Sequence, residues 1–200
     1  MLAIVNAPNE VLSQKAKPVE KVNSDIKKLI EEMKITLDAT DDPKGVGLAA
    51  PQVGKSLQIF VIKQTSRSPF LTFVNPRITQ SQTELSTEPF GKLRAGQSRN
   101  ESQSMNPQKS SKDVKLEGCL SLPTIWGSVQ RKPSLFLEYL DENGKKHKRK
   151  FSGFLATIIQ HEYDHLQGVL FPKRVLEQKG KLYKSKKDKK GEDLFEEIAI

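Results

Sequence analysis

The sequence predicts a protein that mixes helices and strands in a single domain, and three observations lead to this prediction. Two stretches, 23–40 and 152–168, repeat apolar residues at intervals of three and four, as one face of an amphipathic helix does. Several short stretches rich in β-branched and aromatic residues end at turn residues, which is typical of strands. The length of 200 residues suits one domain with its own core. We therefore predict one domain over 1–200.

Capping and turn residues set the limits of the predicted elements. The first helix opens at Asn23 and ends before Asp41. The second has Ser152 as its N-cap and Gly168 beyond its end. In chain order we expect an extended segment at 4–20, a helix at 23–40, a glycine-rich loop of small residues at 45–54, strands at 58–62, 71–76, 125–131 and 134–140, a basic strand ending at 151, a helix at 152–168, and a last strand in the tail at 195–200.

Two segments differ in composition from the rest of the chain. Residues 80–113 are rich in serine and glutamine and contain one aromatic residue, Phe90. Such a segment buries too little apolar surface to offset its ordering entropy, so we predict a polar, flexible insertion. Residues 173–190 are strongly basic, and we interpret them as a solvated turn in preference to an RNA contact.

Composition also narrows the class of protein. No apolar run approaches the ~20 residues that a membrane span needs, and the N-terminus lacks the features of a signal or transit peptide. We therefore expect a cytoplasmic protein with no membrane contact. The single cysteine, Cys119, excludes an internal disulfide. The net charge of +9 favours an anionic neighbour such as nucleic acid or a ribosome, with no sign of specific DNA recognition.

The second predicted helix carries an H-E-x-x-H pattern. His161 and His165 are four positions apart, so on a helix they share one face and can bind a single metal ion, while Glu162 can reach a water on that ion. Both histidines continue an apolar stripe that begins at Phe154, so we expect them to point inward. The alternative is a helix with two core histidines and no metal, which would leave several buried nitrogens in need of partners.

Such a metal site needs a third protein ligand and an open position. No histidine follows His165, and the acids after it lie in charged sequence without periodicity. Upstream, the only soft ligand is Cys119, which follows a glycine that allows close backbone approach. The alternative interpretation of Cys119 is a small buried hydrophobic residue. We favour the metal ligand, since a thiolate and two imidazoles suit a divalent ion.

Three segments resemble the signature motifs of the peptide deformylase family, and they occur in the family's order. They are GVGLAAPQ at 45–52, EGCLS at 117–121 and QHEYDH at 160–165. The N-terminal segment and the pair Asn75 and Pro76 are also similar to the family. The resemblance covers roughly residues 1–76 and 114–178.

The resemblance implies an α+β fold, with small antiparallel sheets packed around a central metal-binding helix. It implies hydrolysis of the N-formyl group from the N-terminal formylmethionine of nascent polypeptides, with release of formate, and action near the ribosomal exit tunnel. The expected metal is Fe(II), with Zn(II), Ni(II) or Co(II) as substitutes. By resemblance, the metal ligands are Cys119, His161 and His165, the general base and acid is Glu162, the oxyanion hole is formed by the Gln52 side chain and the Leu120 backbone N–H, and the substrate backbone is held by Val46, Gly47 and Gly118.

Further expectations concern the surroundings of this site. We expect Ile125, Trp126 and Ile158 to line a pocket for the methionine side chain, with Trp126 alternatively a core residue. Glu117 is expected to pair with Arg131 and so to orient its motif. The chain departs from the family in two places: the link through 80–113 is long, and Lys173 precedes Arg174 where the family tends to have an acid. The second departure puts the C-terminal packing in question.

Two rival functions remain open from the sequence. A zinc peptidase that cuts internal bonds would need a third ligand after His165 and a long cleft. A ribosome- or RNA-binding protein with a decayed metal site would depend on the basic residues of 173–190.

Overall fold

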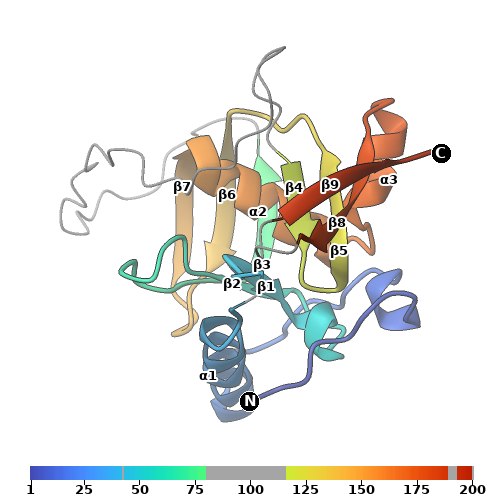
Figure 1. The fold of residues 1–200 in the computed structure, drawn as a ribbon. Coiled ribbons are helices and arrows are strands. Elements are labelled where there is room, and N and C mark those ends of the chain that lie inside the picture. Colours follow the sequence, from blue (N-terminus) through green and yellow to red (C-terminus); the bar gives the residue numbers. More distant parts are fainter. Residues whose placement is uncertain (42, 80–115, 189–192, 200) are drawn as a thin grey trace.

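In the computed structural model, which describes residues 1–41, 43–79, 116–188 and 193–199, helix α2 lies between two antiparallel sheets (Figure 1). The helical elements are η1 (Glu10–Leu12), α1 (Ser24–Asp38), η2 (Ala50–Val53), α2 (Gly153–Leu166) and α3 (Phe171–Glu177). The strands are β1 (Gly47–Ala49), β2 (Ile59–Ile62), β3 (Leu71–Thr79), β4 (Leu116–Cys119), β5 (Leu122–Ser128), β6 (Ser134–Leu140), β7 (Lys146–Ser152), β8 (Leu182–Lys187) and β9 (Asp193–Ile198). The predicted α+β class is confirmed.

Each of the two sheets has a short outer strand that lies beside α2. The first sheet has the order β1-β2-β3-β6-β7, and the second has the order β4-β5-β8-β9. Every pairing in them is antiparallel. Among the described residues, strands β1 and β4 therefore end the two sheets, and an outer strand has backbone groups on one side that a further strand can use.

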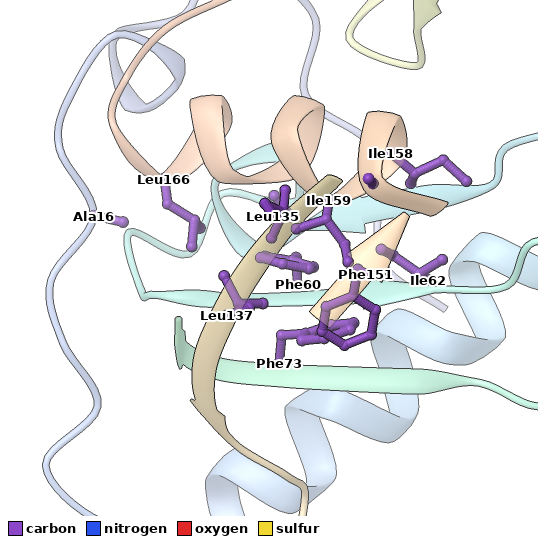
Figure 2. Packing of buried hydrophobic residues seen from close by; sticks show 12 residues of the cluster. Ala16, Phe60, Ile62, Phe73, Leu135, Leu137, Phe151, Ile158, Ile159 and Leu166 are labelled. Carbon is purple, nitrogen blue, oxygen red and sulfur yellow. The ribbon is translucent and has the colours of Figure 1, made fainter. Parts of the chain in front are cut away.

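The main core lies between α2 and the first sheet. Figure 2 shows Ile159 and Leu166 of the helix pointing toward Phe60 and Phe73 of the sheet. The rings of Phe60 and Phe73 stack with centroids 4.7 Å apart. This packing fixes α2, and with it both histidines, to the sheet. Buried residues of this cluster are Ala16, Ala49, Phe60, Ile62, Phe73, Leu135, Leu137, Phe151, Ala156, Ile158, Ile159 and Leu166.

Helix α1 covers a second core and begins where the sequence predicts. The Asn23 side chain accepts a hydrogen bond from the Ile26 N–H at 3.0 Å, so Asn23 caps the helix. The buried face of α1 carries Ile30, Met33 and Leu37. These side chains pack on the buried residues of β1 and β2.

Asn75, one of the two residues noted above as similar to the family, bonds to the N-terminal segment. Its side-chain oxygen accepts from the Val19 N–H at 2.8 Å, and its side-chain nitrogen donates to the Val19 carbonyl at 2.7 Å. Asn75 has a positive φ of 49°, at an irregularity of β3 between Val74 and Arg77. These two hydrogen bonds connect the N-terminal segment to the first sheet.

The interpretation of 173–190 as a solvated turn is wrong over the residues described. Residues 173–177 belong to α3, and residues 182–187 form β8. The reason is burial at α3, where Phe171 and Val175 pack with Cys119 in a third apolar cluster. Lys173 is exposed, so the departure at this position leaves the C-terminal packing intact.

Other expectations had mixed outcomes. The loop predicted at 45–54 contains β1 and η2, while the predicted tail strand is present as β9. Phe154 does not point into the core but is 47% exposed. The insertion predicted at 80–113 lies outside the described residues. Within the described part of the chain, no helix combines the length and apolar character that crossing a membrane requires.

Because Ile159 of α2 is fully buried in the core that the helix forms with the first sheet, we expect Ile159→Ala to lower the free energy of unfolding by about 2–5 kcal/mol. The matched control is Ile35→Ala on α1, where the side chain is 56% exposed and the change should stay within about 0.5 kcal/mol. Urea unfolding of both variants measures the difference. Equal losses in the two variants would contradict this description of the core.

Candidate metal centre

Three ligand atoms converge where β4 meets α2. Cys119 ends β4, and His161 and His165 lie one turn apart on α2. Their candidate ligand atoms all lie within 4.8 Å of one another. The Cys119 Sγ is 3.3 Å from His165 Nε2, and both residues are buried. The structure therefore brings together the three residues that the sequence proposed as metal ligands.

The electrostatics of the cluster favour positive charge at its centre. Burial lowers the pKa of His165 well below its ordinary value, so this imidazole is neutral, as a metal ligand must be. Burial also opposes charge on His161, but hydrogen bonds with Cys119 and Glu117 raise its pKa well above the ordinary value. The hydrogen bonds with Cys119 and with the Glu117 carboxylate thus favour a cation at this position of the cluster.

Glu117 orients the His161 ring through a contact with its Nδ1 atom. The His161 Nδ1 lies 3.0 Å from Glu117 Oε2, which fixes the ring and leaves Nε2 directed to the cluster. Arg131 donates to both oxygens of the same carboxylate, at 2.8 and 2.9 Å. Burial alone would raise the pKa of Glu117, but these hydrogen bonds from Arg131 and His161 lower it overall. The predicted pairing of Glu117 with Arg131 is confirmed.

Asp164 extends this pair into a network that the sequence analysis missed. Arg131 also donates to Asp164 Oδ2 at 2.6 Å, and Arg174 donates to both Asp164 oxygens, at 3.1 and 2.8 Å. Asp164 is buried on α2, one residue before His165. The network therefore joins β4, α2 and α3 through charged hydrogen bonds.

Glu162 points into the same space from α2. It is buried, and its Oε2 has no hydrogen-bond partner among the described residues. Burial raises the pKa of Glu162 to about 7. A Cβ built on Gly47 would lie 2.7 Å from the Glu162 Cδ, so only glycine allows β1 to pass this close to the carboxylate. The two residues are therefore adjacent, as their predicted roles require.

Gln52 brings a polar donor to the cysteine. Its side chain is 1% exposed, its Oε1 accepts from the Ala49 N–H at 2.8 Å, and its Nε2 donates to Cys119 Sγ at 3.5 Å. The first of these hydrogen bonds fixes which way the amide points. Leu120 follows Cys119 directly and lines the same cavity as Gln52. Both predicted oxyanion donors thus lie next to the cluster.

A cavity of about 410 Å³ opens over these residues. Val46, Gly47 of β1 and Gly118 of β4 are among the residues that line it. Of the three residues expected to line a methionine pocket, Trp126 and Ile158 line this cavity, whereas Ile125 does not and packs with the third apolar cluster instead. The sequence analysis missed several lining residues, among them Pro43, Lys44, Gly45, Leu116, Val129, Phe154 and Thr157.

A metal ion fits this set of residues on two grounds. The three donors converge, and two buried polar atoms beside them, Glu162 Oε2 and His165 Nδ1, lack partners within the described residues. A thiolate with two imidazoles is a donor set used for late first-row metals. The arrangement can therefore hold a divalent cation next to a carboxylate of near-neutral pKa and an amide donor, which suits hydrolysis of an amide.

Comparisons with known proteins agree on one family. The family model described as polypeptide deformylase matches residues 1–181, so the match ends just before β8. A peptide deformylase from Chlorobium luteolum is 34% identical over 180 residues, covering 88% of this chain and 78% of that protein. One from Thermodesulfovibrio yellowstonii is 32% identical over 189 residues, covering 93% and 96%.

Solved structures give the same result for the fold. A peptide deformylase from Synechococcus elongatus, in complex with actinonin, is 33% identical with a TM-score of 0.65, covering 86% of this chain and 78% of that one. The enzyme from Thermotoga maritima is 31% identical with a TM-score of 0.65, covering 87% and 97%.

If Cys119 is a ligand, Cys119→Ala should abolish tight metal binding. Loss of a residue that only hydrogen-bonds to a metal ligand typically lowers metal affinity by roughly 10–100-fold. Because Cys119 would be a ligand itself, we expect a larger loss of affinity for a divalent ion. Metal analysis of the purified protein, after dialysis against a weak chelator, gives the metal content per chain. The matched control is His147→Ala, because His147 lies outside the cluster. An unchanged metal content in Cys119→Ala would refute the assignment.

Proposed function

The chain belongs to the polypeptide deformylase family, and from this premise we propose which of its residues carry out the reaction. Its function is to remove the N-formyl group from nascent polypeptides, and its activity depends on a metal ion. The observation that carries the assignment of residues is the convergence of Cys119, His161 and His165 beside Glu162. These four residues are proposed as the three ligands and the general base.

The resident ion is proposed to be Fe(II), with Zn(II), Ni(II) or Co(II) able to replace it. The donor set suits several of these ions, so the choice of iron rests on the family resemblance. The ion would act as a Lewis acid toward the formyl carbonyl and would make a water molecule acidic enough to attack it.

Glu162 is proposed to move the proton. As the water oxygen bonds to the formyl carbon, Glu162 accepts the water's proton, and as the C–N bond breaks it returns a proton to the departing amine. The products are formate and a free N-terminus. A general base works best with a pKa near the operating pH, and burial places the pKa of Glu162 at about 7.

Gln52 and Leu120 are proposed to stabilise the charge that develops on the formyl oxygen. The Gln52 side-chain N–H already points at the cluster, held by its hydrogen bond with Ala49, so it needs no rearrangement during the reaction. The Leu120 backbone N–H follows the ligand directly in the chain. Loss of one such donor typically costs about 3 kcal/mol of transition-state stabilisation.

The nascent peptide is proposed to bind as an added strand between β1 and β4. Both strands end their sheets and both line the cavity, so their outer backbone groups are placed to pair with an extended chain. Val46 and Gly47 would hold one side of the peptide backbone and Gly118 the other. Glycine at two of these positions makes room for side chains of the site, because a Cβ on Gly47 would meet Glu162 and a Cβ on Gly118 would meet Trp126.

Location follows from the substrate. We propose action in the cytoplasm beside the ribosomal exit tunnel, where formylated N-termini emerge. The net charge of +9 supports attraction to ribosomal RNA. The zinc-peptidase alternative is less favourable, because the cluster takes its third ligand from β4, upstream of the helix, and not from residues after His165.

The assignment predicts formate release that depends on Glu162. Anaerobic protein loaded with Fe(II) should release formate from formyl-Met-Ala-Ser, and Glu162→Gln should lower kcat by roughly 10²–10⁴-fold while keeping its metal. The matched control is Glu20→Gln at an exposed position, which should leave kcat unchanged. A folded, metal-loaded Glu162→Gln with normal kcat would show that another group moves the proton.

The approach of β1 to Glu162 predicts a second effect. In Gly47→Ala the new methyl group collides with the Glu162 carboxylate, which must then move. We expect kcat to fall by roughly 10²-fold, since small displacements in a catalytic site can cost that much. Metal content should stay at the wild-type level, because none of the three ligands is touched. A Gly47→Ala enzyme with wild-type kcat would exclude Glu162 from the position described.

A further inference from the structure

The last two strands lie beyond the part of the chain that the family model matches, yet they join the sheet that carries the site. The match ends at residue 181, and β8 and β9 span Leu182–Lys187 and Asp193–Ile198. Strand β8 pairs with β5, which in turn pairs with β4. Figure 1 shows β8 and β9 beside β5, on the same side of the molecule as β4. The β8–β9 pair is therefore connected to the cavity through one sheet.

Trp126 is the residue of β5 that reaches the cavity. It lies opposite Gly118 in the pairing of β4 and β5, so both residues share one face of the sheet. A Cβ built on Gly118 would come within 3.0 Å of the indole ring. The ring therefore lies over Gly118 and takes the space that a side chain there would occupy, at the wall of the cavity.

Two side chains of the β8–β9 pair hold this ring. The Trp126 Nε1–H donates to Ser185 Oγ at 3.2 Å. The ring of Phe195 meets the indole edge to face, with centroids 5.7 Å apart and planes at 89°. Ser185 and Phe195 are themselves opposite each other in the β8–β9 pairing. A polar contact and an aromatic contact thus fix one orientation of the indole.

We propose that the β8–β9 pair is a specificity element, which positions Trp126 as an apolar wall for the peptide side chains that follow formylmethionine. The inference rests on the proposed function, in which the formyl group lies at Cys119. Gly118 precedes Cys119 on β4, so a peptide paired with β4 passes the indole just beyond its first residue. An aromatic or large apolar side chain there packs on the ring, and a small one does not.

The test compares three peptides in the wild-type enzyme and in two variants. Wild-type enzyme should have a lower KM for formyl-Met-Phe-Ala or formyl-Met-Ala-Phe than for formyl-Met-Ala-Ala. Phe195→Ala should raise the KM of the preferred aromatic peptide roughly threefold to tenfold, with kcat and the KM for formyl-Met-Ala-Ala unchanged. Leu194→Ala is the control, since Leu194 is the neighbouring residue, is 55% exposed and has no contact with Trp126 among those described. Equal KM values for all three peptides in wild type, or an aromatic preference unchanged in Phe195→Ala, would overturn the proposal.

The single tryptophan supplies a readout that does not depend on catalysis. Trp126 fluorescence should change when an aromatic formyl peptide binds and change less with formyl-Met-Ala-Ala. Ser185→Ala removes one hydrogen bond only, and it should weaken the aromatic preference in the same direction even if Phe195→Ala fails to fold. Formate release with no preference for aromatic peptides would contradict the role of the β8–β9 pair and leave the catalytic assignment unaffected. Absence of formate release, with the fluorescence response intact, contradicts the catalytic assignment and leaves the binding role of Trp126 standing.

Discussion

The Glu117 carboxylate is the constraint on which the rest of the site depends. It lies on β4, two residues before the cysteine, and it accepts hydrogen bonds from Arg131 and from His161 of α2. The sulfur ligand and the imidazole ligands come from different elements, so their distance depends on how β4 and α2 are held together. Glu117 supplies that connection and sets the ring orientation of His161 at the same time.

Buried charges of this kind are costly unless every partner is present. Asp164 is buried and accepts from Arg131 and Arg174, so three elements meet through a network of two carboxylates and two guanidinium groups. Desolvation offsets much of the attraction in such pairs, so their value lies less in net stability than in geometry. Here the geometry concerned is that of a strand and a helix whose side chains must converge within a few ångströms.

The sequence predicted the parts of the site that depend on local spacing. Two histidines at i and i+4 share a helix face in any context, and Glu162 between them follows from the same period. The residues that it missed depend on tertiary contacts. Asp164 meets Arg131 across 33 positions, a contact that neither residue signals locally. Phe154 fits the apolar stripe of α2 but lies in its first turn, beside the cavity, where it stays exposed.

The same distinction between local spacing and tertiary contacts explains where the predicted fold was wrong. Strand β1 consists of Gly47, Leu48 and Ala49, and glycine and alanine have weak strand preference. Its pairing with β2 and the close packing of Gly47 on Glu162 define it as a strand. The charge of residues 173–190 predicts a solvated segment, but Val175 within it and Phe171 just before it are buried and anchor α3. The contact of Trp126 with Phe195 joins two strands that are far apart in the sequence, so no local sequence pattern predicts it.

The measurement that tests the central claim most directly is X-ray absorption spectroscopy of the zinc-loaded protein. If Cys119, His161 and His165 share one ion, the first shell contains one sulfur at about 2.3 Å and two imidazole nitrogens at about 2.0–2.1 Å. A shell made only of nitrogen and oxygen would contradict the claim, because the single cysteine is the only thiolate that the chain offers.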